Sequence, residues 1–206
     1  MRRAGPRPRK VLELGLFRGP AIRAPAATLM LLVPRDERPL RGDAGLVDWR
    51  LCGRISELLL SGFTRGDFGE ATLLPAGRLF PAERILLFGV GDAAALRSHG
   101  VWRCMRAAVP KLLAIGTRDL SIAFPEGIDL AQHAPSALGG LVEGISAEHG
   151  SLHMRAVLPN ADRDTAALRH ATEQAAREAS RAGVMLEVAW IPDPAEADMP
   201  EGAVFA

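Results

Sequence analysis

The sequence predicts an α/β fold, a three-layer α/β/α domain around a mixed, mostly parallel sheet. Two observations favour this fold class. Apolar runs of strand length alternate with helical patterns through the second half of the chain, as they do where helices connect parallel strands. In the first half, pairs of apolar runs lie close enough in sequence to form antiparallel neighbours. The chain has 206 residues, 48% of them hydrophobic, so one domain with a substantial core is expected.

Seven apolar runs are predicted to be strands, because each has the length of a strand and is bounded by Gly, Pro or polar residues. None approaches the roughly 18–20 apolar residues that a membrane span requires. The predicted strands are Lys10–Phe17, Thr28–Val33, Ala71–Leu74, Arg84–Val90, Leu120–Phe124, Leu152–Pro159 and Val184–Ile191.

The first predicted helix follows the second strand. Asp43 is expected to cap it and Gly62 to end it. Its apolar side chains keep a helical period along one face, and polar residues form the opposite face. The apolar stripe consists of Val47, Leu51, Ile55, Leu58 and Leu59. This periodicity predicts one continuous helix.

Two further helices are predicted in the middle of the chain. Asp92 is expected to cap a helix that runs to about Ala114, and Pro110 inside it predicts a kink or a split. The next helix has its clearest apolar face after Pro135 and ends at Gly150.

The last predicted helix begins after a cap at Asn160 and ends at Ala182. Small side chains dominate its inward line, which permits close packing but buries little apolar area. That line consists of Leu168, Ala171, Ala175 and Ala179. Two interpretations stay open: a solvated outer helix, or a helix that faces a partner.

Charge and composition divide the chain into three parts: a basic arm at 1–9, one α/β domain at 10–191 and an acidic, proline-rich tail at 192–206. Five of the 25 basic residues fall in the first ten positions, which lack the apolar segment of a secretory signal. The remainder carries 20 basic and 24 acidic residues, a net charge of −4, which disfavours a broad nucleic-acid surface. The tail ends in an apolar tip, interpreted as a frayed terminus or a segment that docks into a partner.

The two cysteines, Cys52 and Cys104, both fall in predicted helices. The favoured interpretation is that both are small buried hydrophobic residues in a reducing cytoplasm. A disulfide would require the two helices to be neighbours, which the sequence does not establish.

The segment FGVGDAAAL follows a predicted strand, as the turn of a dinucleotide-binding site does. Gly89, Gly91 and Asp92 are therefore the candidate ligand-binding residues. The fingerprint lacks its third glycine, and Asp92 would repel a phosphate at the same amides. A sharp turn out of the strand also explains both glycines.

A second glycine-rich loop, RGDFGE at 65–70, exposes backbone N–H groups of the kind that bind anions. Its two acidic residues work against that role, and a simple helix-to-strand connection also explains the pattern. His149 and His153 flank a predicted helix end, so they do not form a zinc pair on one helical face. No set of nucleophile, base and orienting residue is predicted, and neither is a metal site.

The segment VDWRLCGRISELLLSGFTRGDFGEATLLPAGRLFPAERILLFGVGD resembles the N-terminal domain of leucyl aminopeptidases, the M17 metallopeptidases. The resemblance continues through LSIAFPE and LVEGI and covers most of 10–191, more weakly after about Gly150. In that family this domain is similar to the macro domain, which implies a mixed sheet sandwiched by helices. The family's two-metal catalytic domain carries an Asn-Thr-Asp-Ala-Glu-Gly-Arg signature that is absent from this sequence. The resemblance therefore implies a domain without the aminopeptidase catalytic residues.

Macro domains bind ADP-ribose through an Asn-rich loop and a Gly-rich phosphate loop. The corresponding segments here, PRDERPLRGD and EGIDLAQHAPSALGG, match neither. A macro-like fold therefore does not by itself imply a macro-like ligand.

Three functional hypotheses follow. The leading one is a non-catalytic cytoplasmic domain that acts in protein assembly or interaction, as a homo-oligomer or with a protein partner, without cofactor, metal or membrane. The second is a small-molecule module that binds a nucleotide or an ADP-ribose-like ligand around Gly89, Gly91 and Asp92. The third, less favoured, is DNA contact through the basic arm. The cations of that arm are Arg2, Arg3, Arg7, Arg9 and Lys10.

Overall fold

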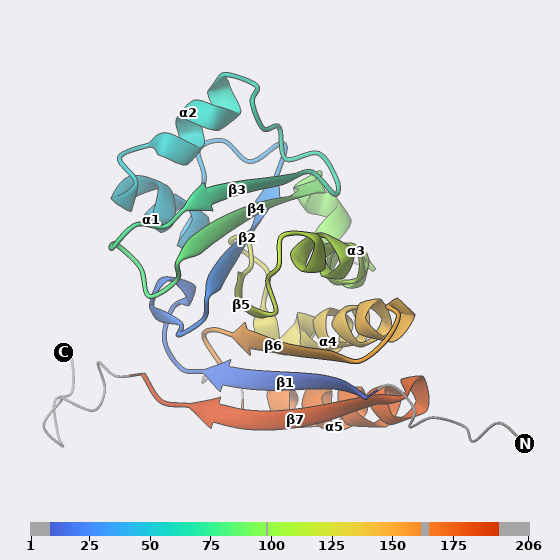
Figure 1. The fold of residues 1–206 in the computed structure, drawn as a ribbon. Coiled ribbons are helices and arrows are strands. Elements are labelled where there is room, and N and C mark those ends of the chain that lie inside the picture. Colours follow the sequence, from blue (N-terminus) through green and yellow to red (C-terminus); the bar gives the residue numbers. More distant parts are fainter. Residues whose placement is uncertain (1–8, 98, 162–164, 194–206) are drawn as a thin grey trace, which may run out of the picture.

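A computed structural model describes residues 9–97, 99–161 and 165–193 of the chain. A seven-stranded mixed sheet forms its centre, in the order β3-β4-β2-β5-β6-β1-β7 (Figure 1). Six strands run parallel and β3 is antiparallel to β4, which confirms the predicted fold class. The strands are β1 (Lys10–Phe17), β2 (Thr28–Pro34), β3 (Ala71–Pro75), β4 (Arg84–Gly91), β5 (Asp119–Ala123), β6 (Leu152–Leu158) and β7 (Val184–Ile191).

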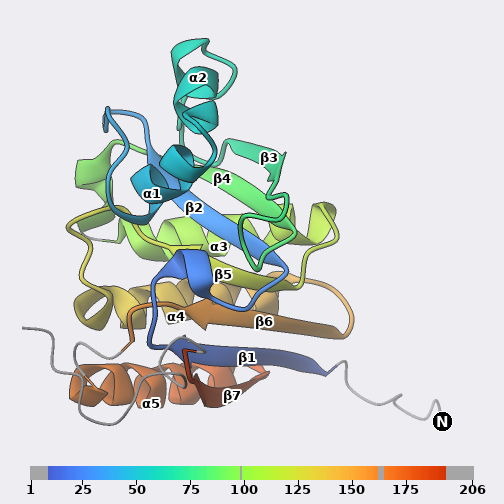
Figure 2. The same ribbon diagram turned by 90° about the vertical axis from the view of Figure 1, so that its left-hand side faces the viewer.

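Helices cover the sheet on both faces (Figures 1 and 2). Three long helices lie side by side on one face: α3 (Gly100–Ala114), α4 (Leu130–Ala147) and α5 (Thr165–Ala182). The opposite face carries α1 (Gly42–Arg50), α2 (Arg54–Leu60) and a short 3-10 helix, η1 (Ala21–Arg23). A second 3-10 helix, η2 (Ala93–Arg97), precedes α3.

The central strand β2 explains the three layers. All seven of its residues are buried, so both faces of this strand must be covered by other elements. Met30 and Leu32 join the large core beneath α3, α4 and α5, whereas Leu29 and Leu31 join the core beneath α1 and α2. Because side chains alternate along a strand, one continuous apolar run supplies both cores.

The pairing of the first two strands differs from the simplest expectation. β3 and β4 form the antiparallel neighbours that the first half of the sequence predicts. β1 and β2 are not neighbours, because β5 and β6 lie between them in the sheet. η1 lies in the connection that carries the chain from β1 across to β2.

The predicted continuous helix from Asp43 to Gly62 is wrong, because the structure has two helices there. α1 ends at Arg50, and Cys52 and Gly53 adopt left-handed backbone conformations with φ of 54° and 81°. The apolar residues on the two sides of the break still face one core, since Val47 and Ile55 are both fully buried in it.

The carboxylate of Asp48 explains why the chain turns at this break. Its Oδ1 accepts the backbone N–H groups of Ile55 at 2.8 Å and Ser56 at 3.0 Å. Its Oδ2 accepts the Ser56 hydroxyl at 2.5 Å. A side chain of α1 thereby satisfies free N–H groups at the start of α2, as a helix cap does.

Two other helix starts also differ from the prediction. Asp92 does not cap α3, which begins at Gly100 after η2, with His99 at the cap position. α3 continues through Pro110, which lies on its exposed side, so the predicted split is wrong and the alternative, a kink, stays a prediction. Asn160 lies outside α5, with a φ of 55°, and residues 162–164 are outside the described ranges.

The inward line of α5 is confirmed, because Leu168, Ala171, Ala175 and Ala179 are all buried in the main core. The prediction for the cysteines is half right. Cys104 is buried, which raises the pKa of its thiol to about 11, whereas Cys52 is exposed at the helix break. Both cysteines are free.

We predict that Asp48→Ala lowers the free energy of unfolding by about 1–2 kcal/mol, because two N–H groups of α2 lose their acceptor. Asp48→Asn keeps a side-chain oxygen as acceptor and is the matched control, with a much smaller expected loss. Urea unfolding of both variants measures the difference. Equal losses for Asn and Ala would show that the acceptor does not hold the break.

Candidate functional site

The candidate residues Gly89, Gly91 and Asp92 lie at the carboxyl end of β4, beside the carboxyl end of β2. Ligands of open α/β sheets bind outside these strand ends. Gly91 has a φ of 76°, and its carbonyl accepts the N–H of Arg35, which follows β2, at 2.9 Å. The predicted turn is therefore present, and the structure brings the three residues together.

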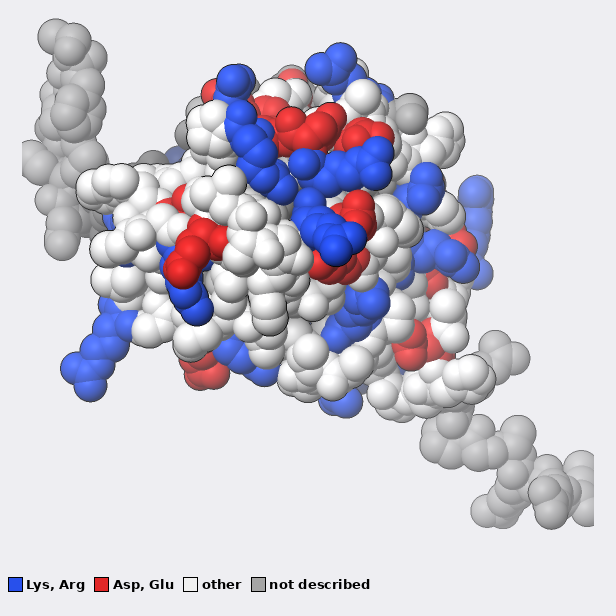
Figure 3. Space-filling view, turned by 90° about the horizontal axis from the view of Figure 1, so that it is seen from above, with Lys and Arg blue, Asp and Glu red and all other residues white. Residues whose placement is uncertain are grey.

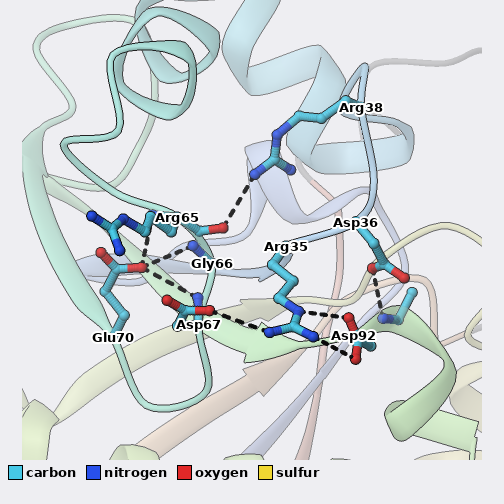
Figure 4. Close-up of polar contacts among 9 residues, drawn as sticks. Arg35, Asp36, Arg38, Arg65, Gly66, Asp67, Glu70 and Asp92 are labelled. Atoms are coloured by element: carbon cyan, nitrogen blue, oxygen red, sulfur yellow. Dashed lines mark hydrogen bonds and ion pairs between the residues drawn. The ribbon is translucent and has the colours of Figure 1, made fainter.

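The loop of residues 65–70 lies directly on this strand end (Figure 4). The N–H of Gly89 donates to the carbonyl of Glu70 at 2.8 Å, and the N–H of Gly91 donates to the carbonyl of Gly66 at 2.9 Å. A Cβ at Gly89 would overlap the backbone carbonyl oxygen of Asp67. Gly89 therefore allows the loop to approach the strand, which is a structural role for this glycine.

The same loop does bind an anion, and that anion is its own Glu70 carboxylate. Oε2 of Glu70 accepts the N–H groups of Arg65 and Gly66 at 2.8 Å each, and that of Asp67 at 3.3 Å (Figure 4). Gly66 and Gly69 have φ of 80° and 79°, which aims these amides inward. The loop is the connection from α2 to β3 that the sequence predicts, and the binding of an outside anion by its amides stays untested.

The environment of Glu70 favours its ionised form. Burial works to raise the pKa of this carboxyl, but the N–H groups of Arg65, Gly66 and Asp67, together with the Thr64 hydroxyl, outweigh it. The pKa of Glu70 is therefore lowered from its ordinary value.

Arg35 connects this loop to the end of β4. Its guanidinium donates to both carboxylate oxygens of Asp92, at 2.6 Å and 3.0 Å, and lies 3.8 Å from a carboxylate oxygen of Asp67. The hydrogen bond with Asp92, with the attraction of that carboxylate, raises the pKa of Arg35. Asp36 accepts the N–H of Ala93 at 2.8 Å, so a second acidic side chain takes an amide after β4.

Arg38 adds a further contact between the same segments. Its guanidinium donates to the carbonyl of Pro34 at 2.9 Å. It also donates to the carbonyl of Arg65 at 3.3 Å (Figure 4). Among the groups that could hold a phosphate here, the amides of residues 65–67 are bonded to Glu70 and the guanidinium of Arg35 to Asp92, whereas Arg38 is bonded to carbonyls. This arrangement is suited to holding three segments together.

A separate hollow of about 760 Å³ lies at the carboxyl ends of β5, β6 and β1. Sequence reasoning missed it, because its lining comes from segments far apart in the chain that only the parallel sheet brings together. Its described polar lining consists of Asp43, Glu126, Asp129 and Asn160, with no Lys or Arg among the described lining residues. Three carboxylates suit a cationic or neutral ligand better than a polyphosphate.

The remaining predicted residues belong to the basic arm. Arg2, Arg3 and Arg7 lie outside the described residues. Arg9 and Lys10 are held by the domain: the Arg9 N–H donates to the Ser151 hydroxyl at 3.2 Å, and Lys10 Nζ donates to the Ser146 carbonyl at 2.5 Å.

The described part of the chain shows neither a metal cluster nor a membrane-spanning helix. Within 9–97, 99–161 and 165–193, no group of three or more His, Cys, Asp or Glu side chains is placed to hold a metal ion. No helix in these ranges is long and apolar enough to cross a membrane.

More than half of the chain matches a known family. Residues 30–148 match the model of the cytosol aminopeptidase family, N-terminal domain. A probable cytosol aminopeptidase of Pseudomonas syringae pv. tomato is 32% identical over 100 residues, which are 48% of this chain. The match covers only 20% of that relative's length.

Solved structures confirm the fold. A mutant of tomato leucine aminopeptidase superposes with a TM-score of 0.63 at 15% identity, over 82% of this chain and 36% of that one. The Oceanobacillus iheyensis macrodomain with ADP superposes with a TM-score of 0.57 at 15% identity, over 75% of this chain and 87% of that one. The macro-like sheet between helical layers, which the resemblance implied, is therefore present.

We predict that Glu70→Gln lowers the free energy of unfolding at neutral pH by about 1–3 kcal/mol, because three amides lose a charged acceptor. The folded-state pKa of Glu70 is depressed, so its stabilisation is full above the pKa of an unfolded glutamate and is lost as pH falls through the folded pKa. The variant should therefore lose less stability on acidification than the wild type.

Chemical denaturation from neutral to acidic pH measures both effects. Glu83→Gln is the matched control, because Glu83 is an exposed glutamate that precedes β4. If Glu70→Gln and Glu83→Gln behaved alike at all pH values, the loop would not depend on its carboxylate.

Proposed function

This chain belongs to the cytosol aminopeptidase family through its N-terminal domain, and from this we propose that it acts as a non-catalytic domain in protein assembly or interaction. The proposal concerns the domain described above, since the matched relative is about five times longer than the matched segment.

One observation carries the proposal: large apolar side chains are exposed on the projecting α1–α2 segment. Trp49 is 75% exposed, Leu60 is 85% exposed and Phe63, just after α2, is 68% exposed. Figure 2 shows α2 standing clear of the sheet at one end of the molecule. We call these three side chains the cap patch. Exposed aromatic and large aliphatic groups gathered on one segment are typical of contact surfaces between proteins.

The charge pattern around this region supports a protein partner over nucleic acid. Figure 3 shows Lys and Arg side chains interleaved with Asp and Glu on the face seen from above, with no broad field of either sign. Ion pairs such as Arg54–Glu57, 2.6 Å apart on α2, contribute to this mixture. A duplex backbone would instead require a continuous basic surface.

The contacts at the strand ends around Gly89, Gly91 and Asp92 also support a role that does not depend on a bound phosphate. A ligand phosphate there would compete with Glu70 for the loop amides and with Asp92 for Arg35. A cytoplasmic location is also proposed, on the ground that the matched relative is named a cytosol aminopeptidase.

A small-molecule role is the second candidate, and the hollow beside β5 and β6 favours it. Its volume of about 760 Å³ is that of a typical ligand pocket. The Oceanobacillus macrodomain with the similar fold was solved with ADP. For the present chain a nucleotide would have to bind among the carboxylates of the hollow or displace the Glu70 contacts.

DNA contact through the basic arm stays a prediction. The cations of that arm are Arg2, Arg3, Arg7, Arg9 and Lys10.

We predict that the wild-type chain associates as its concentration rises, and that Leu60→Gln with Phe63→Gln weakens the association. Because the proposed contact would bury both side chains, replacing them should raise the dissociation constant by about tenfold or more. Light scattering on a sizing column across the micromolar range gives the mass. Leu79→Gln is the matched control, because Leu79 is 53% exposed in the loop between β3 and β4.

If the double variant and the control associated as the wild type does, the cap patch would not be a contact surface for self-association. A chain that stayed monomeric throughout would limit the proposal to a different protein partner.

We predict that ADP-ribose, ADP and ATP at millimolar concentration do not raise the melting temperature of the chain. The reason is that the amides and Arg35 at the strand ends are already bonded to Glu70 and Asp92. Thermal denaturation with each nucleotide measures this. A rise that saturates with ligand concentration would favour the small-molecule role over assembly.

A further inference from the structure

The strand β7 is an edge of the sheet with unusual composition for an edge. It pairs with β1 over all eight of its residues, and in the described part of the chain no strand pairs with its outer side. Its sequence, VMLEVAWI, contains a single charged residue, Glu187, and neither Pro nor Lys. Exposed edges are normally protected by such residues or by bulges, because their free N–H and C=O groups pair readily with another strand.

Large apolar side chains accompany these free backbone groups. Met185, Val188 and Trp190 are 46%, 44% and 48% exposed. The register with β1 places Leu186, Val188 and Trp190 opposite Leu12, Leu14 and Leu16, on the face that α5 covers. The residues that α5 turns toward this face are mostly alanines. Val188 and Trp190 therefore remain about half exposed.

We propose that β7 pairs antiparallel with β7 of a second copy of this chain, around a twofold axis at Val188, which joins the two sheets into one. The inference rests on the proposed role in assembly and assigns it a second surface. A twofold axis perpendicular to the sheet leaves each side chain on the same face in both copies. Two residues that lie directly opposite each other across the axis must therefore point to the same face.

Two central registers meet this condition, and the side chains distinguish them. A centre at Glu187 would place this carboxylate directly opposite its own copy, and directly opposed like charges are destabilising. A centre at Val188 places Val188 opposite Val188, Glu187 opposite Ala189, and Leu186 opposite Trp190 of the second copy. The strand is therefore self-complementary about Val188.

The surface beside α5 has space for the tryptophan in this register. A recess of about 450 Å³ lies between the end of α5 and the start of β7. The small side chains of Ala176 and Ser180 line it together with Leu186, and Arg9, Lys10 and Met185 complete its rim with residues 183–184. Since Trp190 of the second copy faces Leu186, its indole enters this recess, and the twofold axis repeats the contact. Aromatic groups seated in a recess of a partner are typical of strong interface contacts.

Cysteine cross-linking tests the register directly. Residues directly opposed in an antiparallel pair have Cα atoms about 4.5–5.5 Å apart, which a disulfide can bridge. In a Cys52→Ser background, Val188→Cys should form a disulfide-linked dimer under mild oxidation. Glu187→Cys is the matched control, because position 187 faces position 189 of the second copy. The cross-linked fraction at 188 should exceed that at 187 by on the order of tenfold.

Equal cross-linking at 187 and 188, or none at 188, overturns the proposed pairing. Cross-linking at 188 that appears only after residues 194–206 are deleted would show that this segment covers β7 instead, and also overturns it. Since Val188 is exposed, circular dichroism should show that the cysteine variant folds. Trp190→Ala, measured without cross-linking, should reduce association in light scattering.

The result also separates this inference from the proposed function. A chain that associates in light scattering and responds to the cap-patch variants, but does not cross-link at 188, retains its assembly role without the β7 pairing. A chain that is monomeric at every concentration overturns the β7 pairing and self-assembly together.

Discussion

The structure depends on one constraint: its central parallel strands are apolar on both sides and must be covered on both faces. β2 and β4 meet this constraint, with α3–α5 on one face and α1–α2 on the other. The second cover ends near the middle of the sheet (Figure 2). Beyond it, the β1–β2 connection covers this face at the carboxyl ends of β6 and β1, where Phe17 and Val157 are buried with Ala24 and Ala26. Toward the other end of the strands the face carries polar contacts such as His153–Glu13, 2.7 Å apart. β7 is an edge for a separate reason, since it is the last strand in the sheet order.

The carboxyl ends of the strands illustrate how a shared fold can carry a different site. The sheet resembles that of macrodomains, and at the end of β4 two carboxylates of the chain itself are bonded to groups that could hold an anion. Glu70 takes the amides of its loop, and Arg35 holds Asp92. These contacts bind the segments after β2, α2 and β4 to one another. Large apolar side chains are exposed at the cap patch and along β7.

The sequence predicts the strands well because each is a short apolar run bounded by turn residues. It also predicts the buried line of α5, since Leu168, Ala171, Ala175 and Ala179 recur at helical spacing. Local patterns cannot predict the separation of β1 from β2, because strand order is decided by pairing between distant segments. The same limitation hides the hollow beside β5 and β6.

The break between α1 and α2 escapes prediction for a different reason. The apolar period continues through it, and the residue that stabilises it, Asp48, lies seven positions before the first amide it accepts. Cys52 adopts a left-handed conformation that its residue type does not favour. The Glu70 contacts are similarly obscured, because an acidic residue near exposed amides is expected to repel an anion, whereas here it is the ligand of those amides.

Hydrogen–deuterium exchange on the full chain, at low and high concentration and with and without ADP-ribose, distinguishes a domain that works through its surfaces from one that works through a ligand site. If surfaces carry the function, amide protection in β7 and in α1–α2 rises with protein concentration, and the nucleotide leaves residues 65–70, 89–92 and 124–130 unchanged. Protection at those three segments that appears only with the nucleotide, and no dependence on protein concentration elsewhere, would contradict it.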